Sequence, residues 1–261
     1  MEREYNFGLD GKSAIITGAE RGIGLEIAIG YAKAGAKNIA VAGMREEEFE
    51  NASRLIEAAG SKCICIKTDV SDEESVKAMV KKVADTFGRI DILVNNAGIN
   101  KLYPLEEMPT EVWNSIIGVN LTGVFLVSRE AAKIMLKQGE GRIVNVTSMS
   151  GLVVNPLPQT QCAYNSSKAG AIMLTKCMAV EWAERGIRVN GIAPGFMDTP
   201  LTKKRLSTPD DPAVKKWIGG TPLGRVGEPT ELVGLAIYLA GDTAGYTTGT
   251  VISVDGGYTC L

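Results

Sequence analysis

The chain of 261 residues contains no histidine, and this absence removes several kinds of active site. Ser-His-Asp and Cys-His mechanisms both need an imidazole as general base. A zinc site would have to be built from thiolates and carboxylates alone, yet the five cysteines include no C-x-x-C pair. We therefore expect no metal site, and we interpret the cysteines as small, mostly buried side chains in a reducing compartment. Proton transfer must use another side chain.

Strong net charge and long apolar runs are also missing. The net charge of −2 provides no field that would attract nucleic acid or an anionic membrane surface. The first twelve residues, MEREYNFGLDGK, lack the charged-then-apolar profile of a signal peptide, and no later run of about 18 apolar residues is evident. These features predict a cytoplasmic protein that binds neither nucleic acid nor a membrane.

The length and composition fit a single domain over residues 1–261. A chain with 45% hydrophobic and 22% charged residues can bury one sizeable core. No linker, low-complexity tract or internal repeat divides it. We therefore expect one α/β domain.

Short apolar or β-branched runs alternate with helical patterns along the chain. The runs show little alternation between apolar and polar residues, which is typical of parallel strands covered on both faces. We therefore predict one parallel sheet with helices on both sides. The expected strands are 13–17, 38–42, 63–67, 91–95, 142–147, 187–192 and 251–254, and the expected helices are 22–34, 46–59, 72–87, 111–137, 163–184 and 229–240.

One irregular stretch, 194–228, carries five of the ten prolines. A loop of that length inside a compact domain is usually functional or mobile. Within it the apolar residues Phe196, Met197 and Trp217 stand among charged ones, which suits a segment that closes over a site and expels water. We expect a mobile lid over about 196–225.

The first expected strand runs directly into the sequence TGAERGIG and then into a helix. Glycines in such a turn let a pyrophosphate approach the backbone at a helix N-terminus, where free N–H groups and the helix dipole favour anions. A merely tight turn would use some of the same glycines, but the strand–turn–helix order favours a dinucleotide site. The residues expected there are Gly18, Arg21, Gly22, Ile23 and Gly24.

Tyr164 and Lys168 form the most informative pair of side chains. Residues four apart in a helix lie on one face, about 6 Å apart along the axis. A phenol with a pKa near 10 needs about 4 kcal/mol of phenolate stabilisation to exchange protons at neutral pH. An ammonium about 5 Å away supplies roughly 3 kcal/mol, but only in a partly dried cleft. We therefore predict that Tyr164 is an acid/base and that Lys168 lowers its pKa.

Four motifs in order, T-G-x-x-x-G-x-G, NNAG at 95–98, Tyr164 with Lys168, and PG at 194–195, closely resemble the short-chain dehydrogenase/reductase family. The resemblance extends from residue 12 to DGGY at 255–258. It implies a single-domain Rossmann-type, doubly wound sheet of about seven parallel strands and hydride transfer between an alcohol and a carbonyl with a nicotinamide dinucleotide. It also implies a homotetramer built through the helices 111–137 and 163–184 and the C-terminal strand region.

The resemblance assigns cofactor-binding positions beyond the glycine-rich turn. It places Asp69 and Val70 against the adenine, and Asn96, Ala97 and Gly98 along the cofactor and the central strand. An alternative for this part of the chain is helix capping by Ser71 or Asp72, which is compatible with a cofactor contact from Asp69. The remaining cofactor positions implied by the family are Tyr164, Lys168, Pro194, Gly195, Met197 and Thr199.

Catalytic roles also follow from the resemblance. Ser148 would polarise the substrate oxygen, Asn120 would position a water for proton relay, and Lys168 would also hold the nicotinamide ribose. Taken singly, a Ser or Asn at the end of an element is more often a cap or turn former. Together with Tyr164 they predict an oxidoreductase; the non-enzyme alternative is a dinucleotide-binding sensor that has lost catalysis.

The choice of dinucleotide depends on the end of the second strand. An acidic residue there would bind the adenosine ribose and repel a 2′-phosphate. This chain has Gly43 at that place and Arg45 just after it, with Arg21 as a second cation. These residues favour NADP(H) over NAD(H). The alternative is that Arg45 pairs with the carboxylates of 46–48 and Arg21 is solvated.

Fifteen residues, 149–163, separate Ser148 from Tyr164, more than in many members of the family. The loop holds two prolines and several polar side chains that would suit a polyol or ketose, and it resembles the polyol dehydrogenase and ketose reductase branch. A solvated surface turn is the alternative, and a 3-oxoacyl-[acyl-carrier-protein] reductase or general carbonyl reductase is the rival activity. The candidate substrate contacts are Ser150, Asn155, Gln159 and Gln161.

Overall fold

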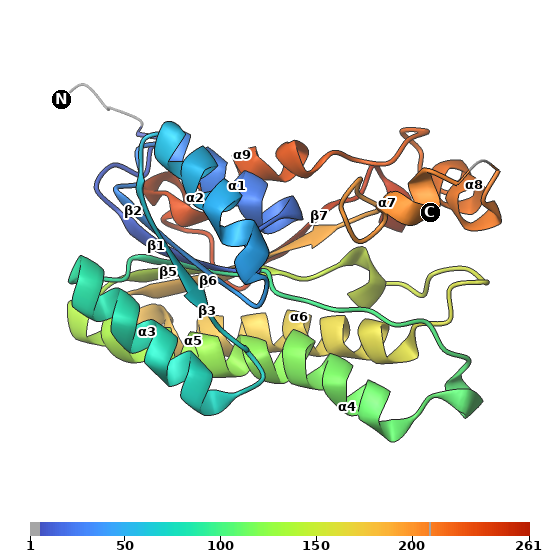
Figure 1. Cartoon of the computed structure of the whole chain (residues 1–261), viewed down its shortest axis with the longest axis horizontal. Helices are drawn as coiled ribbons and strands as arrows, with labels where there is room; N and C mark the ends of the chain where they lie inside the picture. Colours follow the sequence, from blue (N-terminus) through green and yellow to red (C-terminus); the bar gives the residue numbers. More distant parts are fainter. Residues whose placement is uncertain (1–5, 209) are drawn as a thin grey trace.

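A computed structural model describes residues 6–208 and 210–261. Seven strands form one sheet in the order β3-β2-β1-β4-β5-β6-β7, and all neighbours run parallel (Figure 1). Each expected strand is found within one or two residues of its expected bounds. The strands are β1 (Ser13–Thr17), β2 (Asn38–Gly43), β3 (Lys62–Lys67), β4 (Ile92–Asn95), β5 (Gly141–Val146), β6 (Ile187–Pro194) and β7 (Val251–Val254).

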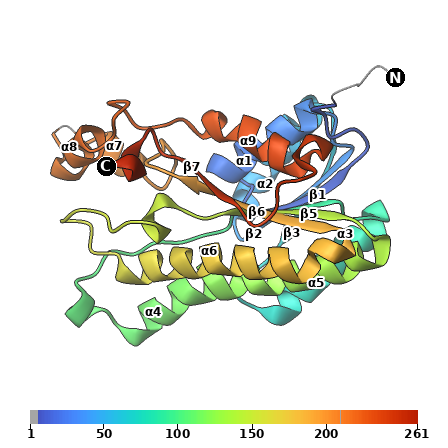
Figure 2. The same ribbon diagram turned by 180° about the vertical axis from the view of Figure 1, so that it is seen from behind.

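Helices cover both faces of the sheet, as predicted. One apolar core lies between the sheet and α1, α2 and α9, and a second lies between the sheet and α3, α5 and α6. Figures 1 and 2 show these two layers on opposite sides of the strands. The helices are α1 (Gly22–Lys33), α2 (Phe49–Ala58), α3 (Glu73–Phe87), α4 (Thr110–Ile117), α5 (Gly123–Gln138), α6 (Cys162–Trp182), α7 (Lys203–Leu206), α8 (Pro212–Gly219) and α9 (Val233–Ala240).

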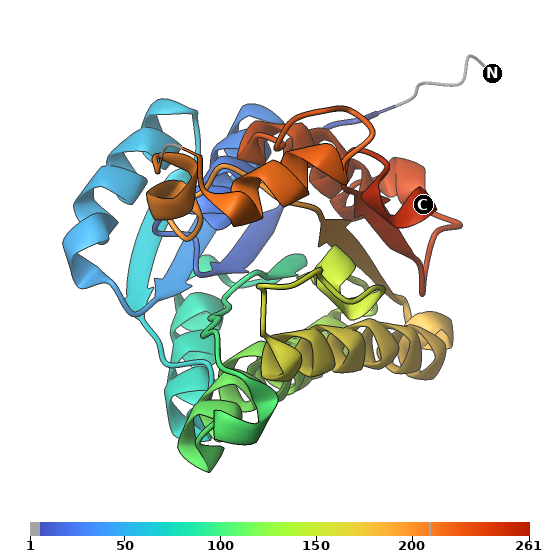
Figure 3. The same ribbon diagram turned by 90° about the vertical axis from the view of Figure 1, so that its right-hand side faces the viewer.

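The strand order places a site at the carboxyl ends of the central strands. β1 pairs with β2 on one side and β4 on the other, so successive strands are added in opposite directions from this point. In open parallel sheets, ligands bind in the crevice outside the strand ends at such a switch point. Figure 3 looks onto this end of the molecule, with α7 and α8 on one side and the start of α6 on the other.

The helix expected over 111–137 is interrupted. A single π-helical turn, Gly118–Thr122, separates α4 from α5. Such turns bulge the backbone by one residue and are frequent at functional sites. The turn carries Asn120, whose side chain is fully buried. The 3.6-residue pattern continues on both sides, so the sequence pattern alone does not reveal the bulge.

The segment Thr110–Gln138 is long and apolar enough to cross a membrane by length and composition, contrary to our expectation that no such stretch exists. Core helices of globular proteins pass the same test. α5 packs in this way, because Val124, Val127, Ala131 and Met135 belong to the second apolar core.

The cysteines are less buried than expected. All five are free thiols; Cys63, Cys65 and Cys162 are partly exposed, and Cys177 and Cys260 are exposed. Cys63 and Cys65 lie in β3, an edge strand with only one neighbour, which leaves them partly open to solvent.

Candidate active site

A cavity of about 750 Å³ opens at the carboxyl ends of the strands and extends from the glycine-rich turn to α6. Nearly all of the residues predicted for the site line it. Gly24 and Asn120 do not. The lining residues that were predicted are Gly18, Arg21, Gly22, Ile23, Arg45, Asp69, Val70, Asn96, Ala97, Gly98, Ser148, Ser150, Asn155, Gln159, Gln161, Tyr164, Lys168, Pro194, Gly195, Met197 and Thr199.

The glycine-rich turn is held against the end of β4. Gly18 and Gly22 have φ values of +63° and +60°, which side-chain-bearing residues rarely adopt. The side-chain amide of Asn96 donates hydrogen bonds of 2.9 Å to the carbonyl oxygens of Thr17 and Gly18. The turn is thereby fixed at the N-terminus of α1, where the helix dipole and free N–H groups suit a phosphate.

Gly24 serves packing rather than lining. A Cβ at this position would lie 2.5 Å from both the Asn96 amide nitrogen and the Gly18 carbonyl oxygen. Only glycine therefore lets α1 approach the turn this closely. The glycines therefore have separate roles: Gly18 and Gly22 shape the cavity wall, and Gly24 lets the helix pack against it.

The far end of the cavity contains a residue that the sequence did not single out. Glu20 is only 7% exposed, lines the cavity, and has a side-chain Oε2 without a hydrogen-bond partner among the described residues. Its carboxyl group lies beside Gly43. The sequence does show an acidic residue in the turn and a glycine at the end of β2. It does not show that Glu20 and Gly43 lie side by side, because that is a tertiary contact.

The charged residues predicted for this end are also present. Arg21 and Arg45 line the cavity. Glu46 pairs with Lys67, with an Oε1–Nζ distance of 2.6 Å, and no carboxylate of residues 6–208 or 210–261 forms an ion pair with Arg45. The alternative in which Arg45 pairs with its acidic neighbours is therefore not found. Asp69 lines the cavity while its Oδ1 accepts a 2.9 Å bond from the Ser71 N–H.

One of the two candidate capping residues in this loop caps the next helix. Asp72 is the N-cap of α3, and its side chain accepts hydrogen bonds from the N–H groups of Glu74 and Ser75 at 2.8 and 3.3 Å. Capping by Asp72 leaves Asp69 at the cavity wall, so the two roles coexist.

The other end of the cavity brings together a phenol, an ammonium and a hydroxyl. Ser148 follows β5, and Tyr164 and Lys168 lie one turn apart on α6. Lys168 Nζ donates a 3.0 Å hydrogen bond to the Val146 carbonyl and lies 5.7 Å from the centroid of the Tyr164 ring. The predicted side chains thus share one wall of the cavity.

Burial dominates the titration of this pair. It raises the pKa of the Tyr164 phenol, and the hydrogen bond from Ser148 lowers that pKa only in part. Burial also lowers the pKa of the Lys168 ammonium to about 8. The ammonium is bound to the Val146 carbonyl, and burial and Ser148 account for the direction of the Tyr164 pKa. That Lys168 lowers this pKa stays a prediction.

Asn120 lies behind this wall. Its Oδ1 accepts a 2.8 Å bond from the Ile99 N–H, and its Nδ2 donates to the Ile99 carbonyl and the Ser167 hydroxyl at 2.9 and 3.1 Å. A Cβ at Gly98 would lie 3.4 Å from Asn120 Oδ1 and 3.6 Å from Lys168 Nζ, so both polar groups face the same glycine. The π-helical turn thus ties the loop after β4 to α6.

The loop before α6 forms a buried amide network. Gln161 accepts a 2.9 Å hydrogen bond from Asn100 and donates to Asn155 and Ser150 at 2.7 and 3.3 Å. Asn155, Gln161 and Ser150 are buried, so the alternative of a solvated surface turn is wrong for these three. Asn100 was missed by the sequence analysis, although it follows NNAG by two residues.

The segment predicted as a lid is folded over this loop. Its rings of Phe196 and Trp217 stack with centroids 4.6 Å apart, and Trp217 Nε1 donates a 2.9 Å bond to Gln159 Oε1. Lys216 Nζ donates to the Leu157 carbonyl at 2.6 Å. The segment is more regular than predicted, because it contains α7 and α8.

Comparisons with known proteins agree with this geometry. A family model described as enoyl-(acyl carrier protein) reductase matches residues 18–259. Galactitol 2-dehydrogenase (L-tagatose-forming) of Cereibacter sphaeroides is 40% identical over 260 residues, covering 99% of each chain. A 3-oxoacyl-[acyl-carrier-protein] reductase of Thermotoga maritima is 41% identical over 249 residues, covering 95% of this chain and 98% of the relative.

A solved structure extends the likeness to the whole fold. A short-chain type dehydrogenase/reductase from Mycobacterium marinum superposes with a TM-score of 0.93 at 41% identity, covering 98% of each chain. Other structures with 36% identity and a TM-score of 0.90 contain NADP. With the parallel sheet, the glycine-rich turn and the cavity described above, these matches show that the chain is an oxidoreductase that belongs to the short-chain dehydrogenase/reductase family.

Proposed function

We propose that the chain transfers a hydride between a nicotinamide dinucleotide and a secondary alcohol or ketone, and that the substrate is a polyol or ketose. The observation that carries the proposal is that one cavity joins the glycine-rich turn to Ser148, Tyr164 and Lys168. A dinucleotide fits the residues present: the turn lies at the N-terminus of α1, and the buried, unpartnered Oε2 of Glu20 awaits a hydrogen-bond donor.

Tyr164 is the proposed acid/base. Its phenol donates a proton to the substrate oxygen during reduction and takes one back during oxidation, while the Ser148 hydroxyl binds the same oxygen. The bound nicotinamide supplies or accepts the hydride. The buried Lys168 ammonium stabilises negative charge that develops on the phenol, and it binds ribose hydroxyls of the cofactor.

Asn120 is proposed as a positioning residue. Both N–H groups of its amide are engaged with Ile99 and Ser167, while Oδ1 accepts one bond from Ile99, retains a second lone pair and faces the same glycine as Lys168. This arrangement fixes the wall next to the ammonium, and it supports proton relay through a water between Asn120 and Lys168.

The amide network supports a polyhydroxylated substrate. Ser150 accepts a hydrogen bond from Gln161, which leaves its own O–H free to donate, and Asn155 Nδ2 has no partner among the described residues. Such groups match a substrate with several hydroxyls, whereas an acyl chain would leave them unsatisfied. The similarity to galactitol 2-dehydrogenase points in the same direction.

For the cofactor we propose that NADP(H) is favoured over NAD(H), because Arg21 and Arg45 line the cavity without ion-pair partners in the described part of the chain. We further propose that residues 196–225 open to admit substrate and close through the Trp217–Gln159 contact.

We infer a homotetramer from the exposed faces of α5 and α6. Phe125 on α5 and Met173 and Val180 on α6 are large apolar side chains open to solvent, Val180 by 82%. Surfaces of this kind mark subunit contacts. Sedimentation of the wild type at a tetramer mass, and at a lower mass for Val180→Glu, is the expected result.

The test is a rate measurement on polyols, ketoses and acetoacetyl thioesters, each with NAD(H) and NADP(H). We expect kcat/KM for the best polyol or ketose to exceed that for the thioester by at least about tenfold, which corresponds to one well-placed polar contact. Activity on the thioester and none on any polyol or ketose would favour the 3-oxoacyl-[acyl-carrier-protein] reductase reaction, for which the Thermotoga maritima relative is named. Binding of dinucleotide without turnover of any ketone would favour a sensor.

A further inference from the structure

A carboxylate stands at the end of β2, although β2 itself does not provide it. A Cβ at Gly43 would lie 2.8 Å from Oε1 of Glu20 and nearer still to Oε2. The space that a side chain of residue 43 would fill is therefore occupied by the carboxyl group of Glu20, which comes from the turn between β1 and α1.

This carboxyl group needs a partner. Glu20 is 93% buried, yet Oε2 accepts no hydrogen bond and forms no ion pair with any described residue. A buried acceptor without a donor destabilises the protein, and more so when it is charged. Because Glu20 lines the large cavity, a donor can reach it from a ligand bound there.

The position of the group indicates which ligand atoms would reach it. In dinucleotide-binding sheets, an acidic residue at the end of the second strand accepts hydrogen bonds from the adenosine ribose. We propose that Glu20 takes this role in the present chain and acts as a specificity-determining residue that binds the 2′-hydroxyl of NAD(H). The inference rests on the proposed dinucleotide binding.

Glu20 and the two arginines then act in opposite directions. Arg21 and Arg45 attract a 2′-phosphate, whereas the Glu20 carboxylate accepts a hydrogen bond from a 2′-hydroxyl and repels a phosphate. The chain accordingly accepts both dinucleotides, and Glu20 limits the preference for NADP(H). Removal of the Glu20 charge weakens the binding of one cofactor and strengthens that of the other.

Calorimetric titration of the full chain with ADP-ribose and with 2′-phospho-ADP-ribose tests this without any turnover. For Glu20→Gln we expect the Kd of ADP-ribose to rise at least tenfold and the Kd of 2′-phospho-ADP-ribose to fall at least threefold. The matched control is Glu50→Gln, an exposed carboxylate on α2 that does not line the cavity, for which both constants stay within twofold. Unchanged constants in Glu20→Gln, or equal effects in the control, would overturn the proposal.

A double variant distinguishes a specific loss of binding from misfolding of the single variant Glu20→Gln. In Glu20→Ala with Gly43→Asp, the carboxylate returns to the same place from β2, so binding of ADP-ribose should recover to within about threefold of wild type. A folded double variant that still binds ADP-ribose tenfold more weakly would also overturn the proposal. Failure of the wild type to bind either nucleotide would instead refute dinucleotide binding itself.

Discussion

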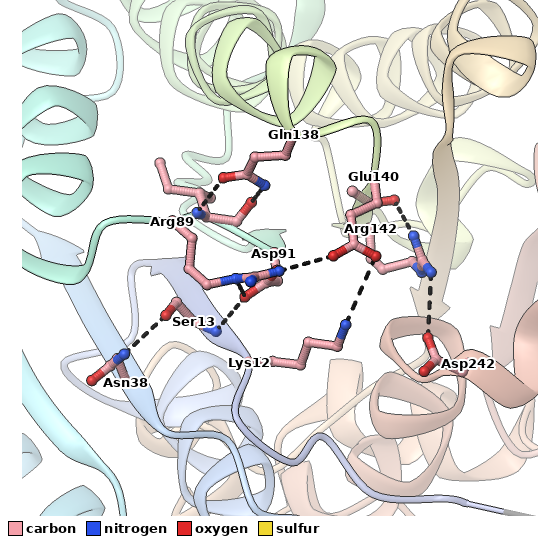
Figure 4. A network of polar contacts seen from close by, with 11 residues as sticks. Lys12, Ser13, Asn38, Arg89, Asp91, Gln138, Glu140, Arg142 and Asp242 are labelled. Carbon is pink, nitrogen blue, oxygen red and sulfur yellow. Dashed lines mark hydrogen bonds and ion pairs between the residues drawn. The ribbon is translucent and has the colours of Figure 1, made fainter.

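The two ends of the sheet differ in how they hold a buried carboxylate. At the amino ends of the strands, Asp91 is 3% exposed and fully bonded. Its Oδ2 accepts a 2.8 Å bond from the Ser13 N–H, and both of its oxygens accept bonds of 2.9 Å from Arg89 Nε. Gln138 closes the same region by bonding both the N–H and the carbonyl of Ile90 (Figure 4).

At the carboxyl ends of the strands, some buried polar atoms have no hydrogen-bond partner in the part of the chain that the structure describes. Oε2 of Glu20 and Oδ1 of Asn100 are buried without partners among the described residues, and the Tyr164 phenol has its pKa raised by burial. The amino end also has an unpartnered buried atom, Arg142 Nε, but the buried carboxylate there is fully bonded, whereas the carboxylate beside the cavity keeps one oxygen without a partner among the described residues. The difference indicates that the amino end is built for stability and the carboxyl end for binding and chemistry.

The largest expected effect is on chemistry at the carboxyl end. Tyr164→Phe removes the proposed acid/base, so kcat should fall by about 10³-fold, within the range for loss of a general acid/base together with its hydrogen bond. Cofactor affinity and the urea midpoint should remain near wild type, because the ring is retained. Retention of more than a tenth of the wild-type kcat would remove the phenol from the mechanism.

The next largest effect is on stability at the amino end. Asp91→Ala leaves the buried Ser13 N–H without an acceptor, while Arg89 keeps its contact with Glu140, so the free energy of unfolding should fall by about 2 kcal/mol. The control is Asp242→Ala, whose exposed contact with Arg142 is worth under about 1 kcal/mol. Urea denaturation measures both; equal effects would contradict the distinction, and kcat of the folded protein should be unchanged in either variant.

A smaller effect is expected from the amide network. Gln161→Leu keeps the side-chain size but removes hydrogen bonds to Asn100, Asn155 and Ser150, so kcat/KM for the best polyol should fall about tenfold. The dissociation constant for dinucleotide should not change, because Gln161 lies at the other end of the cavity. An equal loss of cofactor affinity would indicate general damage to the site.

The smallest expected effect concerns Lys168, whose burial serves the proposed function but lowers the stability of the fold. Its pKa is lowered to about 8 by burial, so the folded state resists the charged form, and this penalty is fully present below pH 8. Because the unfolded chain binds more protons between about pH 8 and 10.5, the stability contribution of Lys168 rises across that window.

Lys168→Met should therefore have a higher free energy of unfolding than wild type at pH 7, by about 1 kcal/mol once the lost bond to Val146 is taken into account. This difference between variant and wild type should disappear by pH 10. Lys176→Met, at an exposed position of the same helix, is the control and should show no such pH trend. A variant less stable than wild type at pH 7 would show that burial of the ammonium is not the governing cost.

Much of this molecule could be predicted from local patterns. The strands follow from apolar runs of four to six residues, and the turn after β1 follows from glycines at the places where φ is positive. The joint position of Tyr164 and Lys168 follows from helix geometry alone. The helical region over 111–137 was also predicted, apart from the π-helical turn that interrupts it.

What local patterns left open depends on partners distant in the chain. Asn155 and Gln161 could equally have been solvated, and only the fold around them shows that Gln161 binds Asn155, Ser150 and Asn100 in the interior. The predicted effect of Lys168 on the pKa of Tyr164 also depends on such a partner, because the ammonium binds a carbonyl on β5.

The amino-acid sequence by itself determined the parallel sheet, the glycine-rich turn and the pairing of Tyr164 with Lys168, because each depends on spacing within one or two adjacent elements. Only the tertiary structure decided that Glu20 fills the place left empty at Gly43 and that the π-helical turn directs Asn120 behind Lys168. Those arrangements join residues more than twenty positions apart, and their geometry is determined by the packing of the whole sheet rather than by any local preference.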